Sequence, residues 1–309
     1  MEVEDVVGTR FGFRSISSEE NLFLNGKAIT FKGVTLRDYP RLDTPEALRA
    51  ARETLLQMKR HNVNAIRTCS VVPAPERFLE LCDELGFYVV ADANLFPESS
   101  MGQAVATDIE YSDLFNARMR SLYGRNKNLT SIVAWSLGDS PDNGICMMNA
   151  YKTLKGLDRQ RPVLYSGAQY AENTDLIAPL RANTDLLSQY MGKSQSRALV
   201  MLAFGNADGN TFGGMQPLWQ KVCDQRRLQG GFYDCGTWAA VADKPYLPEL
   251  KQLYAPVRIR LVSTSVDQAE FEITNLCDFR TLADYKLEYV IGTAIARSEE
   301  RRVGEECRS

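Results

Sequence analysis

No apolar run in this sequence approaches the 18 or more residues that a membrane-spanning helix needs. The formal charge is only −3, with acidic and basic residues interspersed, so nothing predicts binding to nucleic acid or to an anionic membrane. The seven cysteines include no C-x-x-C pair, which favours buried free thiols. The acidic residues 1–5 lack the apolar segment of a signal peptide. The 44% of hydrophobic residues is enough for a large core, in one large domain or two smaller ones.

Strand and helix patterns alternate over residues 31–255. Thr44 and Pro45, for example, are typical of the cap and first position of a helix, which we expect to follow the first strand. The apolar segments predict eight strands, at 31–36, 64–69, 87–94, 132–138, 162–166, 185–190, 198–204 and 230–234. Eight such units predict the α/β class and a (β/α)8 TIM barrel. A doubly wound open sheet is the alternative, because alternation does not determine whether the sheet closes.

Two shorter regions flank the predicted barrel. Residues 1–30 form an N-terminal segment with a hairpin, in which Asn25 and Gly26 indicate a type I′ turn. Residues 256–296 alternate apolar and polar side chains with period two in three segments, at 257–262, 270–273 and 285–290. This pattern predicts the first strands of an all-β sandwich, and three strands are too few to complete one. We therefore expect the natural protein to continue beyond this chain.

The last thirteen residues, 297–309, require a separate interpretation. Their sequence matches one translated frame of a common sequencing adapter at every position except Glu305. A native charged tail is the alternative. We interpret the segment as adapter read-through and exclude it from the prediction of the fold.

The segment 132–140 carries the strongest functional signal. It reads Ile-Val-Ala-Trp-Ser-Leu-Gly-Asp-Ser, an apolar strand that ends in polar residues. A TIM barrel keeps its chemistry at the carboxyl ends of its strands. The segment therefore delivers Asp139 and Ser140 to the rim where a catalytic site is expected.

Several motifs resemble glycoside hydrolase family 2, in particular its large β-galactosidases. They follow the family's order between residue 9 and about residue 292, and comprise 11–14 with 24–27, 58–68, 80–90, 135–138, 205–214 and 275–285. The resemblance implies a TIM barrel that acts on carbohydrate. It also implies that the two N-terminal sandwich domains usual in the family are missing here. The expected partners are carbohydrate, those sandwich domains and a second copy of the chain, with neither nucleic acid nor membrane.

The same resemblance predicts that the catalytic carboxyl groups are lost. A retaining glycosidase needs an acid/base and a nucleophile about 5 Å apart. The family's acid/base position is Ser140 here, and its nucleophile position is Ala203. A serine hydroxyl is too weak an acid, and a methyl group cannot attack the anomeric carbon. The sequence therefore predicts a catalytically inactive barrel.

The rest of the family's pocket is retained only in part. The resemblance implies four retained pocket residues, Arg67, Asn94, Trp135 and Tyr190, of which Arg67 and Tyr190 would surround the nucleophile. All four are also of a kind that holds a barrel rim together. At other pocket positions this chain differs from the family or offers a candidate of its own: Asp92, Arg37, Asp38, Ser70, Asn206 and Trp238. Trp238 is expected to stack against a sugar or to lie in the core. The segment between Tyr190 and Ala203 is shorter than usual, which would reshape one wall of the pocket.

No metal or other cofactor is expected. The family's Mg²⁺ ligands would fall on Phe96, Glu98 and Ser140, a set that cannot build an octahedral oxygen site. The family's site is rich in histidine, whereas the single histidine here, His61, is expected at a helix end.

Three hypotheses for the function therefore stand at the level of sequence. The first is a degenerate family 2 barrel without activity. The second is a glycosidase that has recruited other carboxylates, with Asp139, Asp92, Asp208 and Glu98 as candidates. The third is a carbohydrate-binding or assembly module that uses the retained cleft.

Overall fold

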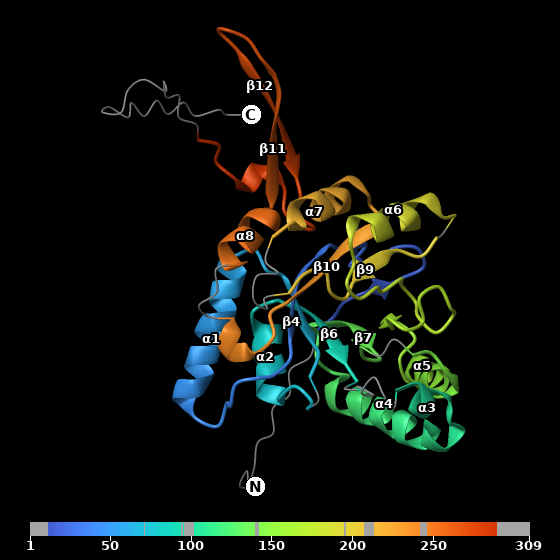
Figure 1. The fold of residues 1–309 in the computed structure, drawn as a ribbon. Helices are drawn as coiled ribbons and strands as arrows, with labels where there is room; N and C mark the ends of the chain where they lie inside the picture. Colours follow the sequence, from blue (N-terminus) through green and yellow to red (C-terminus); the bar gives the residue numbers. More distant parts are fainter. Residues whose placement is uncertain are drawn as a thin grey trace. The chain divides into compact units, whose positions relative to one another are not determined.

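The computed structural model consists of two compact units, which meet in sequence between Ala255 and Pro256 (Figure 1). The structure describes residues 12–70, 72–93, 95, 102–139, 142–194, 196–206, 213–241 and 246–288. No helix in these ranges is both long and apolar enough to cross a membrane. The first unit holds the alternating strands and helices, and the second is a β-hairpin with a short helical turn.

Seven parallel strands form the curved sheet of the first unit (Figure 1). Their order in space is β8-β7-β6-β5-β4-β10-β9, so β4 and β10, which come first and last in sequence among these seven strands, pair with each other. Their bounds are β4 (Phe31–Leu36), β5 (Ala65–Thr68), β6 (Tyr88–Asp92), β7 (Ile132–Ser136), β8 (Val163–Leu164), β9 (Leu199–Met201) and β10 (Leu228–Asp234).

Backbone pairing at residues 176–177 closes this sheet. Leu176 forms a parallel bridge with Leu164 of β8, and Ile177 forms one with Leu199 of β9. Ile177 N donates to Ala198 O at 2.8 Å, and Val200 N donates to Ile177 O at 2.9 Å. These residues fill the sixth position of an eight-membered ring. The predicted TIM barrel is confirmed, and the open sheet is excluded.

The predicted sixth strand at 185–190 is wrong, because these residues lie in helix α6 (Thr184–Gly192). Asn183 caps this helix by accepting a hydrogen bond from Leu186 N at 2.8 Å. Leu187 and Tyr190 are buried three residues apart, which places both on one face of a helix. The true sixth position has only two paired residues, too few to give a periodic signal.

The other helices cover the outside of the barrel and bury apolar side chains against it (Figure 1). Thr44 caps α1 as predicted, since its Oγ1 accepts from Ala47 N at 3.2 Å. Helix α7 ends at Asp224, and β10 begins only four residues later, at Leu228. The bounds are α1 (Pro45–Arg60), α2 (Glu76–Glu84), α3 (Gly102–Thr107), α4 (Ser112–Asn126), α5 (Ile145–Leu157), α7 (Met215–Asp224) and α8 (Tyr246–Leu253), with 3-10 turns η1 (Ile109–Tyr111) and η2 (Trp238–Ala240).

The predicted N-terminal hairpin is present and covers the amino end of the barrel. It comprises β1 (Ile16–Ser17), β2 (Phe23–Leu24) and β3 (Lys27–Ala28), and the turn residues Asn25 and Gly26 have φ of 49° and 76°. Leu22, Leu24 and Ile29 pack into the apolar cluster inside the barrel. The Gln229 side chain of β10 accepts from Leu22 N and donates to Leu22 O and Ile29 O. The hairpin is thus bonded to the last strand of the barrel.

The second unit contains an antiparallel pair, β11 (Val257–Thr264) and β12 (Ala269–Asn275), followed by η3 (Leu282–Asp284). The third strand predicted at 285–290 is not formed over 285–288, and its last two residues lie outside the described ranges. Alternating side chains alone do not make a strand, since each strand needs a neighbouring backbone to bond with.

Candidate functional site

Five polar side chains meet where β5, β6 and β7 end, and we call them the Arg67 cluster: Arg67, Cys69, Asp92, Ser136 and Asp139. Arg67 Nη2 donates to Asp92 Oδ2 at 3.0 Å and to Asp139 Oδ1 as well, while Nη1 donates to Leu202 O at 3.3 Å. The side chains of Arg67 and Asp92 are fully buried. One guanidinium therefore links carboxylates from two neighbouring strands.

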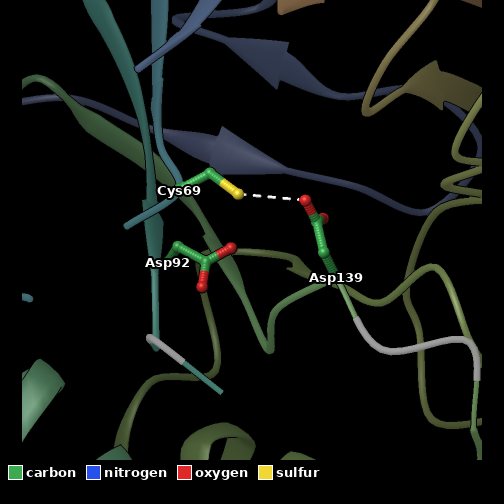
Figure 2. Close-up of side chains that lie close together, drawn as sticks. All are labelled: Cys69, Asp92 and Asp139. Carbon is green, nitrogen blue, oxygen red and sulfur yellow. Dashed lines mark hydrogen bonds between the residues drawn. The ribbon is translucent and has the colours of Figure 1, made fainter. Parts of the chain in front are cut away.

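The two carboxylates accept further hydrogen bonds from within the cluster. Figure 2 shows the Cys69 thiol directed at Asp139, where Sγ donates to Oδ2 at 2.9 Å. Ser136 Oγ donates to Asp92 Oδ2 at 2.8 Å. Each carboxylate thus accepts hydrogen bonds from the guanidinium and from one neutral donor. These bonds offset most of the free energy that is lost when a carboxylate is removed from water.

Gly138 makes the position of Asp139 possible. Its φ is +122°, and a Cβ on this residue would lie 2.2 Å from Leu95 O. Its backbone N also donates to Ser136 Oγ at 3.2 Å. Because only glycine fits this turn without strain, the Gly138–Asp139 pair directs the carboxylate back over the end of the barrel.

The electrostatics of the cluster keep Asp139 ionised. Burial by itself favours the neutral acid, but the Arg67 charge and the hydrogen bonds from Arg67 and Cys69 hold the pKa of Asp139 below its usual value of 3.8. Burial raises the pKa of the Cys69 thiol, so the sulfur stays protonated and acts as a donor. The two carboxylates in turn raise the pKa of Arg67 against the effect of burial. A general acid needs the opposite shift.

A second ion pair joins β4 to β10 beside the cluster. Arg37, which follows β4, donates from Nε to Asp234 Oδ2 at 2.9 Å and also from Nη2. Its Nη1 lies 3.9 Å from Cys69 Sγ, which connects the pair to the Arg67 cluster. The next residue, Asp38, accepts from Trp238 N, and the half-buried Trp238 packs edge-on against Phe78 with ring centroids 5.5 Å apart. These groups form a continuous polar rim.

Ala203 and Asn206 are the two predicted pocket residues that follow β9, the seventh strand of the barrel, and both lie at this rim. Ala203 follows β9, and Ala182 N donates to its carbonyl at 3.0 Å. The preceding carbonyl, of Leu202, is the one that accepts from Arg67. Asn206 forms a parallel bridge with Asp234, and the carbonyl of Asn206 accepts a hydrogen bond from Tyr233 Oη. Ala203, the residue predicted to stand at the nucleophile position, thus follows directly on a residue bonded to the Arg67 cluster, and its side chain is a methyl group.

Trp135 and Tyr190 do not join this rim. The Trp135 indole is fully buried and donates from Nε1 to Asp158 Oδ2 at 3.0 Å, beneath the Arg161 guanidinium. Because Ser136 points to Asp92, its neighbour Trp135 points to the opposite face of the strand. Tyr190 lies on α6 and donates to Arg197 O. Both side chains serve packing between strands and helices.

Some predicted site residues lie outside the described ranges, namely Asn94, Phe96, Glu98, Ser140 and Asp208. Sequence reasoning had also missed the roles of Cys69, Ser136 and Asp234. Cys69 stands two residues after Arg67, and strand alternation was the signal that both face the same side. Pairing of Asp234 with Arg37 required the closed barrel, which brings β10 beside β4.

The cluster has the donor types of a small metal site, but it already holds a cation. One ligand atom from each of Cys69, Asp92 and Asp139 lies within 4.8 Å of the others. The Arg67 guanidinium binds both carboxylates. A metal ion would have to displace this buried charge, so the arrangement fits an ion-pair network better than a metal centre.

A closed parallel barrel with a charged rim at the carboxyl ends of its strands places the chain in the TIM-barrel class. The sequence model described as "Glycosyl hydrolases family 2, TIM barrel domain" matches residues 16–254, so the chain belongs to glycoside hydrolase family 2. The family expected from the motifs is confirmed.

Relatives and solved structures agree with this assignment. The chain is 31% identical over 237 residues to a β-galactosidase of Yersinia enterocolitica and 33% identical over 244 residues to one of Lactococcus lactis. Each match covers 72% of this chain but only 22% and 24% of the relative, so the chain spans about a quarter of their length.

Two crystal structures share the fold at lower identity. A family 2 β-galacturonidase of Eisenbergiella tayi bound to galacturonate gives a TM-score of 0.62 at 18% identity, covering 80% of this chain and 55% of that one. A β-glucuronidase of Ruminococcus gnavus gives 0.63 at 15% identity, covering 79% and 53%. These likenesses support the barrel architecture.

Proposed function

We propose that this chain is a family 2 barrel that binds carbohydrate at its rim without hydrolysing it by the retaining mechanism. The observation that carries the proposal is the state of Asp139. It is the described carboxylate closest in sequence to the acid/base position, and it is held by Arg67 and Cys69 with a lowered pKa. An ionised carboxylate that is paired with a guanidinium has no proton to give to a leaving group.

The nucleophile position supports the same proposal. Ala203 borders the Arg67 cluster, and its side chain cannot form a glycosyl intermediate. The other carboxylate of the cluster, Asp92, is fully buried and bound by Arg67 and Ser136. Neither Asp92 nor Asp139 is therefore free to attack an anomeric carbon.

Carbohydrate binding is supported by the groups that remain. The rim presents the Arg37–Asp234 pair, in which the Arg37 side chain is 45% exposed, and the half-buried indole of Trp238 lies nearby. Charged side chains fixed by each other bind sugar hydroxyls at a low entropic cost, and an indole face binds the apolar face of a sugar ring. We further propose that this binding needs no Mg²⁺, because Phe96, Glu98 and Ser140 replace the family's ligands.

The test is an assay with nitrophenyl β-galactoside, β-glucuronide and β-mannoside at high protein concentration, together with glycan-array binding in EDTA. The unmodified chain is expected to bind glycans without turnover. The double variant Ser140→Glu/Ala203→Glu is expected to gain turnover, because loss of a nucleophile alone typically costs roughly four to six orders of magnitude. The matched control is Ser140→Gln/Ala203→Gln, which restores size without the carboxyl groups.

Turnover by the unmodified chain would contradict the proposal. If Asp139→Asn then abolished that turnover, the alternative of a recruited carboxylate would hold instead. Absence of both glycan binding and turnover would leave a degenerate barrel without a carbohydrate role.

A further inference from the structure

A cavity of about 720 Å³ lies on the side of the barrel opposite the rim. Its walls come from residues 12–15 before the hairpin, from Lys127 after α4 and from residues 157–161 between α5 and β8. These segments precede strands β7 and β8, whereas the Arg67 cluster lies where the strands end. The cavity is therefore separate from the site described above.

The cavity is lined by four cations and one anion. Asp158 is the anion, and Arg161 Nη1 binds it at 2.7 Å. Asp158 also accepts from the Trp135 indole and from the backbone N of Arg161, so both of its oxygens are occupied. Within the part of the chain that the structure describes, Arg14, Lys127 and Arg159 have no carboxylate in ion-pair contact. The cavity thus keeps an excess of three positive charges.

Two of its guanidinium groups are held side by side. Arg14 Nη2 and Arg161 Nε both donate to Ile132 O, at 3.1 and 2.9 Å. This carbonyl carries only a partial negative charge, so it orders the Arg14 guanidinium without neutralising it, whereas Arg161 is already paired with Asp158. Arg14 Nε is buried, and among the described residues it has no hydrogen-bond partner. Burial and the nearby Arg161 lower the pKa of Arg14 to about 10, and the charges of Asp158 and Asp83 offset only part of this effect.

We propose that this cavity binds the phosphoryl group of inorganic phosphate or of a phosphomonoester. Guanidinium forks match the oxygens of phosphate, and charge-assisted hydrogen bonds of this kind are about twice as strong as neutral ones. The contacts with the carbonyls of Leu129 and Ile132 fix Arg14 in advance, which reduces the ordering cost of binding. The Tyr123 ring and Leu157 form an apolar wall that suits the organic part of an ester.

The test is calorimetric titration of the full chain with phosphate and with phenyl phosphate at constant ionic strength. Saturable binding of at least one of them is expected. The double variant Lys127→Gln/Arg159→Gln removes two exposed cations of the cavity and is expected to weaken binding by at least about tenfold. Tighter binding of phenyl phosphate would identify an ester as the ligand, and equal binding would identify phosphate itself.

The matched control is Arg118→Gln/Lys152→Gln, which removes two exposed cations from α4 and α5 outside the cavity. It changes the net charge equally and is expected to leave binding unchanged. An equal loss in both double variants, or no saturable binding by the unmodified chain, would overturn the proposal. Circular dichroism of each variant separates loss of binding from loss of fold. Glycosidase and glycan assays are independent of this result, because they report on the opposite end of the barrel.

Discussion

Arg67 is the counter-ion shared by the two carboxylates of its cluster. Its buried guanidinium serves Asp92 and Asp139 together, and its other terminal nitrogen binds the backbone beside Ala203. A buried pair of this kind adds little net stability compared with apolar residues, yet removal of one member leaves an uncompensated charge. The residue is therefore more sensitive to substitution than an average core position.

Arg67→Met is expected to lower the free energy of unfolding by about 3–5 kcal/mol, because two buried carboxylates lose their counter-ion. Urea denaturation measures this change. The control is Arg49→Met, since Arg49 and Glu46 form an exposed pair worth less than about 1 kcal/mol. The triple variant Arg67→Met/Asp92→Asn/Asp139→Asn is expected to recover part of the loss. A loss below about 1 kcal/mol in Arg67→Met would contradict this account of the cluster.

The stability of the chain is expected to fall in acid partly through Asp139. The folded pKa of Asp139 is lowered, so its contribution is complete above the unfolded value near 3.8 and is lost as the pH falls through the folded pKa. Denaturation at several pH values between about 7 and 3 measures this slope. Asp139→Asn is expected to be less stable at neutral pH and to have a flatter acid limb. An unchanged acid limb in this variant would show that other groups control the transition.

At the scale of single elements, β10 determines how the barrel closes. It pairs with β4 and β9, and its pairing with β9 is interrupted between Leu228 and Gly231. Gln229 uses this irregularity to bond with the N-terminal hairpin. Gly230 has φ of +79°, and a Cβ there would lie 2.1 Å from Phe31 O. No other residue type fits this position without moving β4.

Gly230→Ala is expected to cost more than about 3 kcal/mol, since it adds backbone strain to a clash inside the sheet. Gly156→Ala is the matched control, because Gly156 lies within α5 and a Cβ there meets no atom within 4 Å. That control is expected to stabilise the chain by up to about 1 kcal/mol. Thermal denaturation of both variants measures their melting temperatures, and that of Gly230→Ala is expected to be much the lower. Similar melting temperatures would refute the strained role of Gly230.

Elements with strong local signals could be predicted, and those set by long-range pairing could not. The cap of α1 and the turn at Asn25–Gly26 are local, and both were predicted correctly. The sixth barrel position has two paired residues at 176–177, whereas the longer apolar segment at 185–190 looked more like a strand and is a helix. Periodicity finds elements only when they are long enough to repeat.

The candidate site shows the same division. Arg67, Asp92 and Asp139 meet because parallel strands present their carboxyl ends at one edge, and this follows from the predicted strands. Trp135 was assigned to the pocket through the family resemblance, although the alternation within β7 directs Ser136 inward and Trp135 outward. Its hydrogen-bond partner, Asp158, lies at the end of α5, so the sequence of β7 alone could not predict this bond.

At the scale of the whole molecule, the barrel unit ends with α8. Tyr254 is buried in the first unit, and its hydroxyl donates to Gly33 O of β4 at 2.8 Å. Residues from Pro256 form the second compact unit, in which Ile259, Leu261 and Phe271 are all more than half exposed.

A chain that ends at Ala255 is expected to have the same unfolding free energy as the full chain within about 0.5 kcal/mol, because it keeps the whole of the first compact unit, α8 included. A chain that ends at Val241 loses the buried Tyr246, Leu250 and Tyr254 and is expected not to fold stably. Urea denaturation and gel filtration distinguish these outcomes. Destabilisation of the chain ending at Ala255 by several kcal/mol would mean that the second unit supports the barrel.

The bond between Gln229 and the N-terminal hairpin has a consequence for the order of folding. Gln229 lies 207 residues after Leu22 and 200 residues after Ile29, yet it satisfies the backbone of both. On the ribosome, the hairpin is made before the barrel strands, and its bonds with Gln229 cannot form until β10 has been made. Contacts between residues so far apart in sequence slow folding. They also lengthen the time during which aggregation-prone intermediates exist. The interval before β10 emerges is therefore the one in which exposed apolar surface of the hairpin favours aggregation.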